Sequence, residues 1–359
     1  MNPRCSAGGL AVGGFSRIGR EGIVLVGNPG PEHVGNHFRN AAEGLDLPFQ
    51  LCNSDLAFQA HPALVKFNWW FRSHRPTHLR EFSREVGKTC IVSNAKYLLA
   101  AGLAPVDAET LDLVGRAGTF RMNFLTDDPW NPQHTASWFM RALPHYDIVF
   151  TPRQANIEDL RRIGCARVEY LPFAYAPAIH FPDPPATPEE EKRYSADVFF
   201  AGGADAERVS QLTALMRAGM DVALYGGYWN RYPETSSRAR GHATTEVIRK
   251  AAAGARISLC LVRRANRDGH AMRTYELAAM GGCILAEDTE EHREILGPDG
   301  TAAVYFRSIP DLVERARELL RNDSRRDRLA AEARIRICGA SNTYSDRLDN
   351  MLRLARGGH

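Results

Sequence analysis

The 359-residue chain lacks any apolar run near the roughly 20 residues that cross a membrane. Its first 20 residues are rich in glycine but lack the sustained apolar core of a signal peptide, so we expect a flexible tail there. The net charge is only +3, without the basic excess of a dedicated nucleic-acid binder. We therefore expect a cytoplasmic protein with no nucleic-acid partner and no stable membrane insertion.

The chain also lacks the usual metal-binding motifs. Its seven cysteines contain no CxxC pair, and Cys90, Cys260 and Cys283 lie in apolar runs, which predicts buried free thiols in a reducing compartment. His33 and His37 are four residues apart, but no glutamate stands between them as in an H-E-x-x-H motif. We predict no metal site.

Apolar residues, at 44% of the chain, are enough to fill two cores. The first half alternates between short β-branched runs and helical stretches, which predicts a parallel sheet. The expected strands are 22–30, 49–53, 88–94, 120–126, 146–152 and 166–174, and the expected helices are 33–45 and 156–164.

Residues 181–197 combine four prolines with a run of charges. They favour an interdomain linker, with a long surface loop inside one domain as the alternative. The alternation then restarts, and the chain is largely helical from 324 to 355. The expected strands are 196–203, 221–227, 256–262, 283–288 and 302–306, and the expected helices are 207–219, 245–255 and 309–323. The pattern predicts two doubly wound α/β domains of the Rossmann-like kind with a ligand site between them.

The stretch "DGHAMRTYELAAMGG" (268–282) follows the expected strand 256–262. The start of a helix carries partial positive charge and free N–H groups, which favours anions near His270. The guanidinium of Arg273 can donate two parallel hydrogen bonds to a phosphate or carboxylate, and the carboxylate of Glu276 can accept hydrogen bonds from two sugar hydroxyls. The alternative is an ordinary carboxylate–guanidinium pair on a helix face.

Two further strand ends carry glycine pairs. In "DVFFAGG", Gly202 and Gly203 allow a ligand to approach the backbone, although a plain turn explains them equally well. In "LYGGYWN", Gly226 follows Tyr225, and Tyr225, Tyr228 and Trp229 either border a base pocket or belong to the core.

Two adjacent acids, Asp127 and Asp128, follow the expected strand 120–126 in "FLTDDPWNP". They are candidates for orienting an acceptor hydroxyl or taking its proton, with a turn role before Pro129 as the alternative. Tryptophans of the same half suggest an aromatic surface for sugar rings or a flat aglycone, or else packing. They are Trp69, Trp70, Trp130 and Trp138.

The runs "ARISLCLVRRANRDGHAMRTYELAAMGGCILAED", "VYFRSIPDLVERARELLRNDSRRDRLAAEARIRI" and "NTYSDRLDNML" resemble the CgeB-like (spore maturation protein-like) glycosyltransferases over residues 196–355. More weakly, "TDDPWNP", "VFTPRQANIEDLRRIG" and "VEYLPFAYAP" resemble the matching acceptor domain. The resemblance implies the GT-B fold. It divides the chain into a tail (1–20), an acceptor domain (21–180), a linker (181–196), a nucleotide-sugar domain (197–340) and a helix that crosses back (341–359).

The resemblance also implies roles for residues. In the broader group, two glutamates separated by seven residues mark the donor site; Glu276 matches the second, and Asp268 stands at the first. Glu276 is then expected at the donor ribose, and His270 and Arg273 beside the diphosphate. An Arg–Lys pair of the group has no clear match among Arg263, Arg264 and Arg267.

The predicted activity is transfer of a hexosyl-type sugar from a nucleotide-diphosphate sugar to a hydroxyl of an unidentified saccharide, natural product or protein. We expect retention of configuration and neither metal nor cofactor. The predicted catalytic residues are Asp127, Asp128, Asp268 and Arg273. The alternatives are another enzyme on the same plan, such as a nucleotide-sugar epimerase, and a catalytically silent sugar-nucleotide-binding protein.

Overall fold

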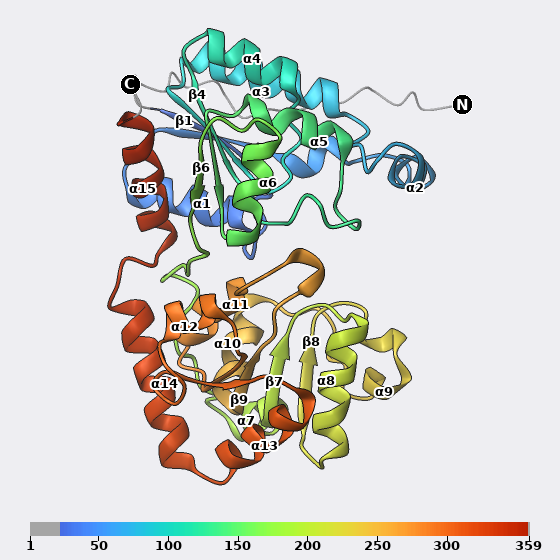
Figure 1. Cartoon of the computed structure of the whole chain (residues 1–359), viewed down its shortest axis with the longest axis vertical. Helices are drawn as coiled ribbons and strands as arrows, with labels where there is room; N and C mark the ends of the chain where they lie inside the picture. Colours follow the sequence, from blue (N-terminus) through green and yellow to red (C-terminus); the bar gives the residue numbers. More distant parts are fainter. Residues whose placement is uncertain (1–21, 358–359) are drawn as a thin grey trace, which may run out of the picture. The chain divides into compact units, whose positions relative to one another are not determined.

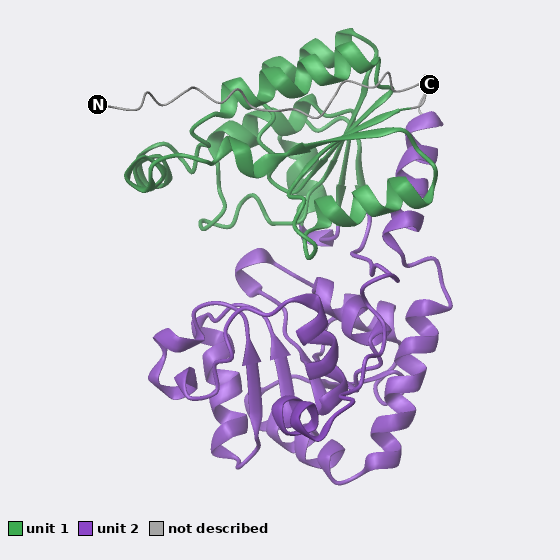
Figure 2. Cartoon of the chain, turned by 180° about the vertical axis from the view of Figure 1, so that it is seen from behind, with its two compact units in different colours: residues 1–151, 156–169 green, residues 152–155, 170–359 purple. Residues whose placement is uncertain are grey.

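The computed structural model describes residues 22–357, so the predicted tail (1–20) lies outside the described residues. The chain divides into two compact units (Figure 2). Unit 1 runs to Thr151 and includes Asn156–Glu169; unit 2 comprises Pro152–Ala155 and the chain from Tyr170 onward. Within residues 22–357, every helix is too short or too polar to span a bilayer.

Unit 1 is built on a six-stranded sheet with strand order β2-β1-β3-β4-β5-β6, and β1 to β5 pair in parallel. Helices pack around it, as Figure 1 shows. The strands are β1 (Ile23–Gly27), β2 (Phe49–Asn53), β3 (Tyr97–Ala101), β4 (Phe120–Phe124), β5 (Ile148–Thr151) and β6 (Val168–Tyr170). The helices are α1 (Val34–Gly44), α2 (Pro62–Phe71), α3 (Leu79–Ser93), α4 (Ala108–Arg116), α5 (Ser137–Ala142) and α6 (Ile157–Arg162).

The predicted strand at 88–94 is wrong, because these residues form the last turns of α3. Phe82, Val86 and Cys90 are buried and recur every four residues, the spacing of one helix face. Asn94 ends the helix in the left-handed conformation, with φ of 52°. The strand of this region is β3, three residues further on.

Unit 2 contains a five-stranded sheet with strand order β11-β10-β9-β7-β8, all paired in parallel. The strands are β7 (Ala196–Ala201), β8 (Val222–Tyr225), β9 (Ala255–Cys260), β10 (Ile284–Glu287) and β11 (Ala303–Phe306). The helices are α7 (Pro188–Tyr194), α8 (Ala206–Arg217), α9 (Pro233–Ser236), α10 (Thr245–Gly254), α11 (Met272–Ala279), α12 (Glu290–Leu296), α13 (Ile309–Leu320), α14 (Asp323–Cys338) and α15 (Tyr344–Arg356). The two α/β units with parallel sheets confirm the predicted fold class.

Each unit has its own apolar core. Strands β1, β8, β10 and β11 are buried at every position, which explains why they read as continuous apolar runs in the sequence. Cys90 lies in the core of unit 1 and Cys283 in that of unit 2. The six described cysteines are all free thiols, and four are buried. Cys5 lies outside the described residues.

The segment predicted as a linker, 181–196, lies inside unit 2 and contains α7. The hydroxyl of Thr187 caps this helix by accepting from the N–H of Glu190. Glu190 also pairs with Lys250 of α10 at 3.2 Å. The boundary between the units instead falls in the stretches around residues 151–156 and 169–170.

Candidate functional site

Two glycine turns follow neighbouring strands of the sheet in unit 2, β7 and β8. The N–H of Gly202 donates to the carbonyl of Tyr225 (2.9 Å), and the indole of Trp229 donates to the carbonyl of Gly202 (2.8 Å). Gly226 has φ of +123°, and a Cβ there would lie 2.3 Å from the carbonyl oxygen of Gly202. A Cβ at Gly203 would make ordinary van der Waals contact with the guanidinium of Arg263 (3.8 Å) and the carbonyl oxygen of Gly227 (3.9 Å). The predicted glycines therefore meet at the carboxyl edge of the sheet.

The aromatic residues beside these glycines divide into two kinds. Tyr225 is buried, its ring centroid lies 5.6 Å from that of Phe199, and its hydroxyl accepts a hydrogen bond from Arg240. Trp229 is buried against Phe200. The core alternative thus describes Tyr225 and Trp229 in this structure, whereas Tyr228 is more than half exposed.

Arg208 is a buried arginine in the first turn of α8, directly after the Gly202–Gly203 turn. Its guanidinium donates to the carbonyls of Gly203 (3.1 Å) and Leu261 (3.3 Å), so it lies where β7 and β9 end. Its Nε has no hydrogen-bond acceptor among the described residues, and the carboxylate of Asp205 is 3.6 Å away. Burial, and then the nearby Arg263, lower the pKa of Arg208.

Asp268, one of the predicted catalytic acids, is held on two sides. Its Oδ1 lies 2.5 Å from Nε of Arg153, and its Oδ2 accepts from the backbone N–H of Arg263 (3.2 Å). The Asp268 carboxylate also acts on Arg208, raising the pKa that Arg263 lowers. Arg208, Arg263 and Asp268 therefore form one charged group at the carboxyl edge of unit 2.

Glu276 and Arg273 form an ion pair on α11, which is the alternative that the sequence left open. The Glu276 side chain is buried, whereas that of Arg273 is 28% exposed, so the guanidinium keeps access to solvent. His180 accepts at Nδ1 from the N–H of Ala176, which leaves the proton on Nε2, 3.6 Å from the Glu276 carboxylate. Burial lowers the pKa of His180, and Glu276 opposes this.

α11 is close to the Arg208 group through the end of β9. Cys260 is the last residue of β9. Burial raises the pKa of its thiol, Arg273 and a hydrogen bond with Thr274 lower it, and Glu276 raises it, so all three residues of α11 lie near this strand end. The next residue, Leu261, supplies the carbonyl that binds Arg208. The two sets of charged residues therefore flank the end of one strand.

His270 is buried before α11, and both ring nitrogens have partners in unit 2. Its Nδ1 lies 2.5 Å from a carboxylate oxygen of Glu291, and its Nε2 accepts from the N–H of Phe173 (3.3 Å). A carboxylate cannot donate when ionised, so Nδ1 carries the proton. The ring contributes to packing in this conformation, and its predicted contact with a diphosphate remains a prediction.

Asp127 and Asp128 follow β4 in unit 1 and differ in environment. Asp128 is buried, and its carboxylate accepts from the N–H of Trp130 (3.0 Å), which is the turn role left open by the sequence. The side chain of Asp127 is 35% exposed and accepts from the hydroxyl of Thr126 (3.1 Å). Asp127 is the better placed of the two to meet a hydroxyl from solution.

A cavity of about 490 Å³ lies at the same edge of unit 2, beyond the predicted residues. It is lined from α8 and from the ends of β10 and β11, with Arg264, Glu287 and Arg307 among its side chains. Burial raises the pKa of Glu287, although Arg264 and the N–H of Val262 oppose this. None of the predicted site residues lines it.

Sequence reasoning missed Arg208. The available signal was an arginine in the first turn of a helix that follows a strand and two glycines. The helix 207–219 has ordinary amphipathic character, and Arg208 is far in the sequence from the arginines that follow β9, so no local pattern marks it.

Residues 208–353 match the family model described as "Glycosyl transferase-like". No curated protein matches the chain. A solved structure of sucrose-phosphate synthase from Thermosynechococcus elongatus is similar in fold, with a TM-score of 0.57, 11% identity, and coverage of 95% of this chain and 100% of that one. A structure of HepE from Anabaena, in complex with UDP and glucose, has a TM-score of 0.60 and 11% identity over 93% and 100% of the two chains.

A third structure is that of a trehalose-6-phosphate synthase studied for glycosyl transfer with retention; it has a TM-score of 0.60 and 13% identity, covering 95% of this chain and 99% of that one. At such identities the likeness establishes the fold, which is that of the GT-B glycosyltransferases. Together, the family match and the fold support a glycosyltransferase of the GT-B type. None of these comparisons identifies the CgeB-like subfamily.

Proposed function

We propose that this protein transfers a sugar from a nucleoside-diphosphate sugar to a hydroxyl-bearing acceptor, without a metal and with retention of configuration. The observation that carries the proposal is Arg208, a buried cation held by carbonyls at the ends of β7 and β9 beside the glycine turn at Gly203. The Nε of this cation has no hydrogen-bond acceptor among the described residues, and its nearest carboxylate, that of Asp205, is 3.6 Å away. A buried cation in such a position is stabilised further when an anion binds to it. The similar HepE structure, which contains UDP, supports a diphosphate as that anion.

The donor diphosphate is proposed to bind Arg208, Arg263 and the solvent-accessible Arg273, with Glu276 bound to the ribose. When the bond from the anomeric carbon to the β-phosphate oxygen breaks, negative charge grows on the leaving group, and these guanidinium groups stabilise it. Three fixed cations supply the charge that a divalent metal provides in other sites, which is why we propose transfer without one. His270 positions the start of α11 through Glu291.

Retention is proposed because the similar trehalose-6-phosphate synthase structure concerns transfer with retention. The acceptor hydroxyl loses its proton as its oxygen bonds to the anomeric carbon, and we assign the uptake of that proton to Asp127. Asp268 is assigned an indirect role, since it holds Arg263 and Arg153. We place the protein in the cytoplasm, in keeping with its free cysteines.

A second candidate function is binding of a sugar nucleotide without transfer. It is favoured by the ion pair between Asp268 and Arg153, which occupies the acid that the family resemblance puts next to the donor sugar. Both candidates share the donor site and differ only in turnover, so donor binding alone does not separate them.

The first test is the melting temperature with UDP-, GDP-, dTDP- and CMP-sugars. A ligand that binds only the folded chain raises it, by an amount that grows with the logarithm of ligand concentration. We expect one class of donor to do so, and the double variant Arg273→Ala/Glu276→Ala to abolish the effect. The double variant removes both members of the ion pair, so no unpaired buried charge is left behind.

The matched control is Arg161→Gln, which breaks an exposed arginine–glutamate pair of the same spacing, with Glu158. It is expected to leave the shift intact. If the double variant folds and responds to donors like the parent protein, the assignment of α11 to the donor site is wrong.

A further inference from the structure

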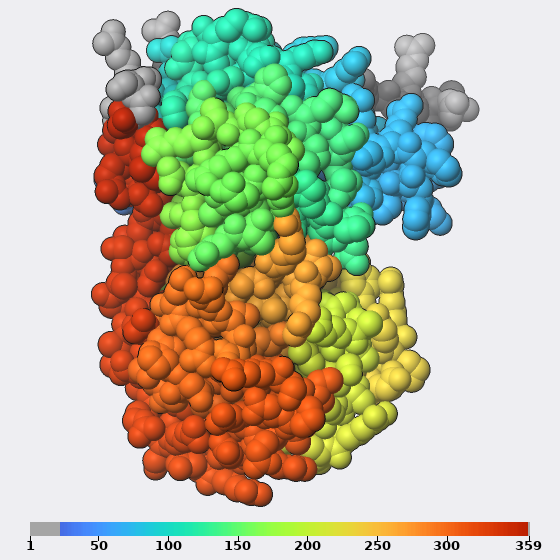
Figure 3. Space-filling model, in the orientation of Figure 1, coloured from blue at the N-terminus to red at the C-terminus, as the bar shows by residue number. Residues whose placement is uncertain are grey.

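α2 is an apolar helix that unit 1 leaves largely uncovered. Its sequence is "PALVKFNWWF", and Asn68 is its only buried residue. Phe67 and Trp69 are about half exposed (48% and 47%), whereas Trp70 and Phe71 are exposed by 70% and 77%. Figure 1 shows α2 standing out from the sheet of unit 1, and Figure 3 shows its residues, in blue, at the molecular surface. An exposed apolar patch of this kind marks an interaction site.

The chain around α2 carries charge of one sign. Residues 56–80 contain Lys66, Arg72, Arg75 and Arg80 but no aspartate or glutamate. This charge favours a partner with a negative surface. Helices that lie in the interface between the membrane and water also combine aromatic residues with flanking arginine and lysine.

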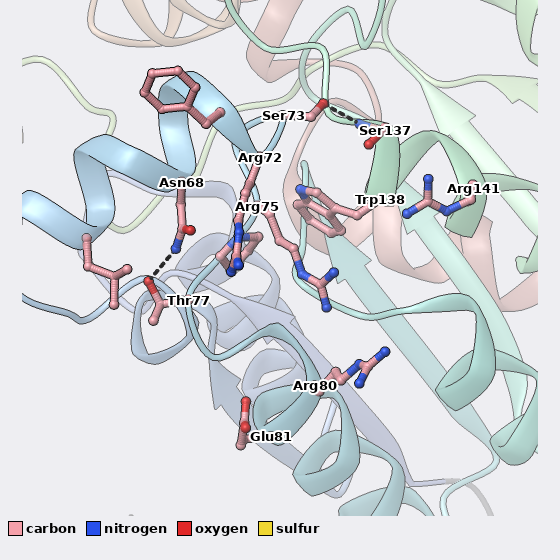
Figure 4. A pocket seen from close by; sticks show the side chains of 13 residues that line it. Asn68, Arg72, Ser73, Arg75, Thr77, Arg80, Glu81, Ser137, Trp138 and Arg141 are labelled. Carbon is pink, nitrogen blue, oxygen red and sulfur yellow. Dashed lines mark hydrogen bonds between the residues drawn. The ribbon is translucent and has the colours of Figure 1, made fainter.

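A cavity of about 660 Å³ opens directly beside α2, within unit 1. Phe71 of the helix lines it, together with Arg72, Arg75, Arg80, Arg141 and Trp138. Figure 4 shows the guanidinium groups of Arg75, Arg80 and Arg141 around the ring of Trp138. The one acid in the lining is Glu81, and none of the four arginines makes an ion pair with a described carboxylate. The cavity therefore holds several guanidinium groups whose charge is available to an anion.

Two buried polar atoms of the same lining have no partner among the described residues. They are Oδ1 of Asn68 and Nε1 of Trp138. Asn68 is 4% exposed and uses its amide nitrogen to donate to Thr77 (3.0 Å), drawn as a dashed line in Figure 4; Trp138 is 5% exposed. A buried donor or acceptor left unpaired costs free energy, so these atoms point to a ligand that supplies both an acceptor and a donor.

We propose that α2 and this cavity form a docking surface for an anionic phospholipid bilayer. Phe67, Trp69, Trp70 and Phe71 enter the boundary between headgroups and acyl chains. A headgroup phosphate enters the cavity, where the arginines and the indole N–H of Trp138 donate to it, and a headgroup hydroxyl donates to Asn68. A bilayer fits better than a folded acidic protein because apolar exposure, basic charge and a phosphate-sized polar cavity lie together.

The test is co-sedimentation of the full chain with vesicles of phosphatidylcholine, with and without phosphatidylglycerol. We expect binding that requires the anionic lipid and weakens as salt is raised. Arg75→Gln/Arg141→Gln is expected to lower the partition coefficient on the order of tenfold or more, since each basic residue near an anionic surface contributes several-fold. Trp70→Ser/Phe71→Ser is expected to lose at least about as much by removing apolar insertion.

Two control variants match these changes elsewhere on the surface. Ile335→Ser removes an apolar side chain of α14 that is 64% exposed, and Arg161→Gln/Arg162→Gln removes two exposed cations of α6. Both are expected to bind vesicles like the parent. All changed positions on α2 are exposed, so melting temperatures close to that of the parent are expected, and Trp70→Ser alone serves if the double variant fails to fold.

Three outcomes would overturn the proposal. One is absence of binding to phosphatidylglycerol vesicles. Another is vesicle binding equal to that of the parent by both Arg75→Gln/Arg141→Gln and Trp70→Ser/Phe71→Ser. The third is a rise in melting temperature with inorganic phosphate, lost in Arg75→Gln/Arg141→Gln, without vesicle binding, because the cavity would then serve a soluble anion. None of these variants touches Arg208, Arg273 or Glu276, so failure here leaves the proposed donor site standing.

Discussion

At the scale of single residues, Arg208 and Glu276 illustrate two ways of holding a charge in a buried place. Glu276 is neutralised by Arg273 one turn away, so the pair is stable without a ligand. Arg208 instead donates to two backbone carbonyls, which orient the guanidinium, and its nearest carboxylate, that of Asp205, lies 3.6 Å from Nε, beyond hydrogen-bond distance. We therefore assign to Arg208 the larger gain when a diphosphate binds.

His292 gives a prediction for pH. It is fully buried; its Nδ1 donates to the carbonyl of Glu287 (2.8 Å), and its Nε2 accepts from the hydroxyl of Thr274 in α11 (3.1 Å). Burial lowers the pKa of His292 from 6.5 to about 4. Above pH 6.5 the ring is neutral in both states; as pH falls from 6.5 to about 4, the unfolded chain takes up the proton first, and stability is lost.

The expected loss from His292 is about 3 kcal/mol, complete near pH 4. It is measured as the fall in the free energy of unfolding between these pH values, in the parent and in His292→Gln. The variant should show a smaller fall by about that amount, whatever its stability at neutral pH. An equal fall in both proteins contradicts a neutral buried ring.

The site residues also show what a sequence can and cannot reveal. The Arg273–Glu276 pair follows from helix geometry, because residues three apart share a face. The meeting of Gly202 with Gly226 follows from the rule that parallel strands end at one edge. The contacts of Asp268 with Arg153 and of His270 with Phe173 join positions about a hundred residues apart, and no local pattern encodes them.

At the scale of elements, the strands that are followed by glycines were predicted well. β1, β7 and β8 are short apolar runs, and a glycine marks where each of them ends. The run "KTCIVSN" was misread because its β-branched residues favour a strand locally, while packing of the face with Phe82, Val86 and Cys90 decides for a helix. α7 was missed for a similar reason, since its proline and charges are typical of a linker, yet Lys250 and the cap at Thr187 stabilise a helix there.

The C-terminal helix α15 is the element most open to a direct test. It begins with a capping box between Thr343 and Asp346. Arg347 donates to the carbonyls of Pro172 and Phe173, each at 3.0 Å, so the helix is bonded to a segment some 175 residues earlier. The backbone of Tyr175 bonds to both Asn342 and Tyr344.

Truncation before Asn342 is expected to destabilise the chain by more than about 5 kcal/mol, because buried residues such as Leu348 and Met351 are lost with it. Arg347→Gln is the milder variant, with an expected loss of at least about 2 kcal/mol from its charged hydrogen bonds. Thermal and urea unfolding measure both. Truncation before Gly357 is the control, and an unchanged melting temperature after the longer truncation contradicts the stabilising role assigned to the contacts of α15.

At the scale of the whole molecule, the alternation of strands and helices was enough to predict two parallel α/β units. The boundary between them was not, because it depends on which unit a segment packs against: residues 152–155 belong with unit 2, while 156–169 belong with unit 1. The prolines and charges of 181–196 give no information about such contacts. The sequence pattern therefore predicted the number of units better than it predicted the boundary between them.

The central claim is that Arg208 and its neighbours stabilise a nucleoside diphosphate as it leaves a donor sugar. The most direct measurement is the release of nucleoside diphosphate from the donor sugars in the presence of saccharide, natural-product and peptide acceptors, with the glycoside detected by mass. We predict release by the parent and by Arg161→Gln, and a rate at least about a hundredfold lower in Arg208→Gln. Release at the parent's rate by a folded Arg208→Gln variant, or donor binding without any release by the parent, would contradict the account.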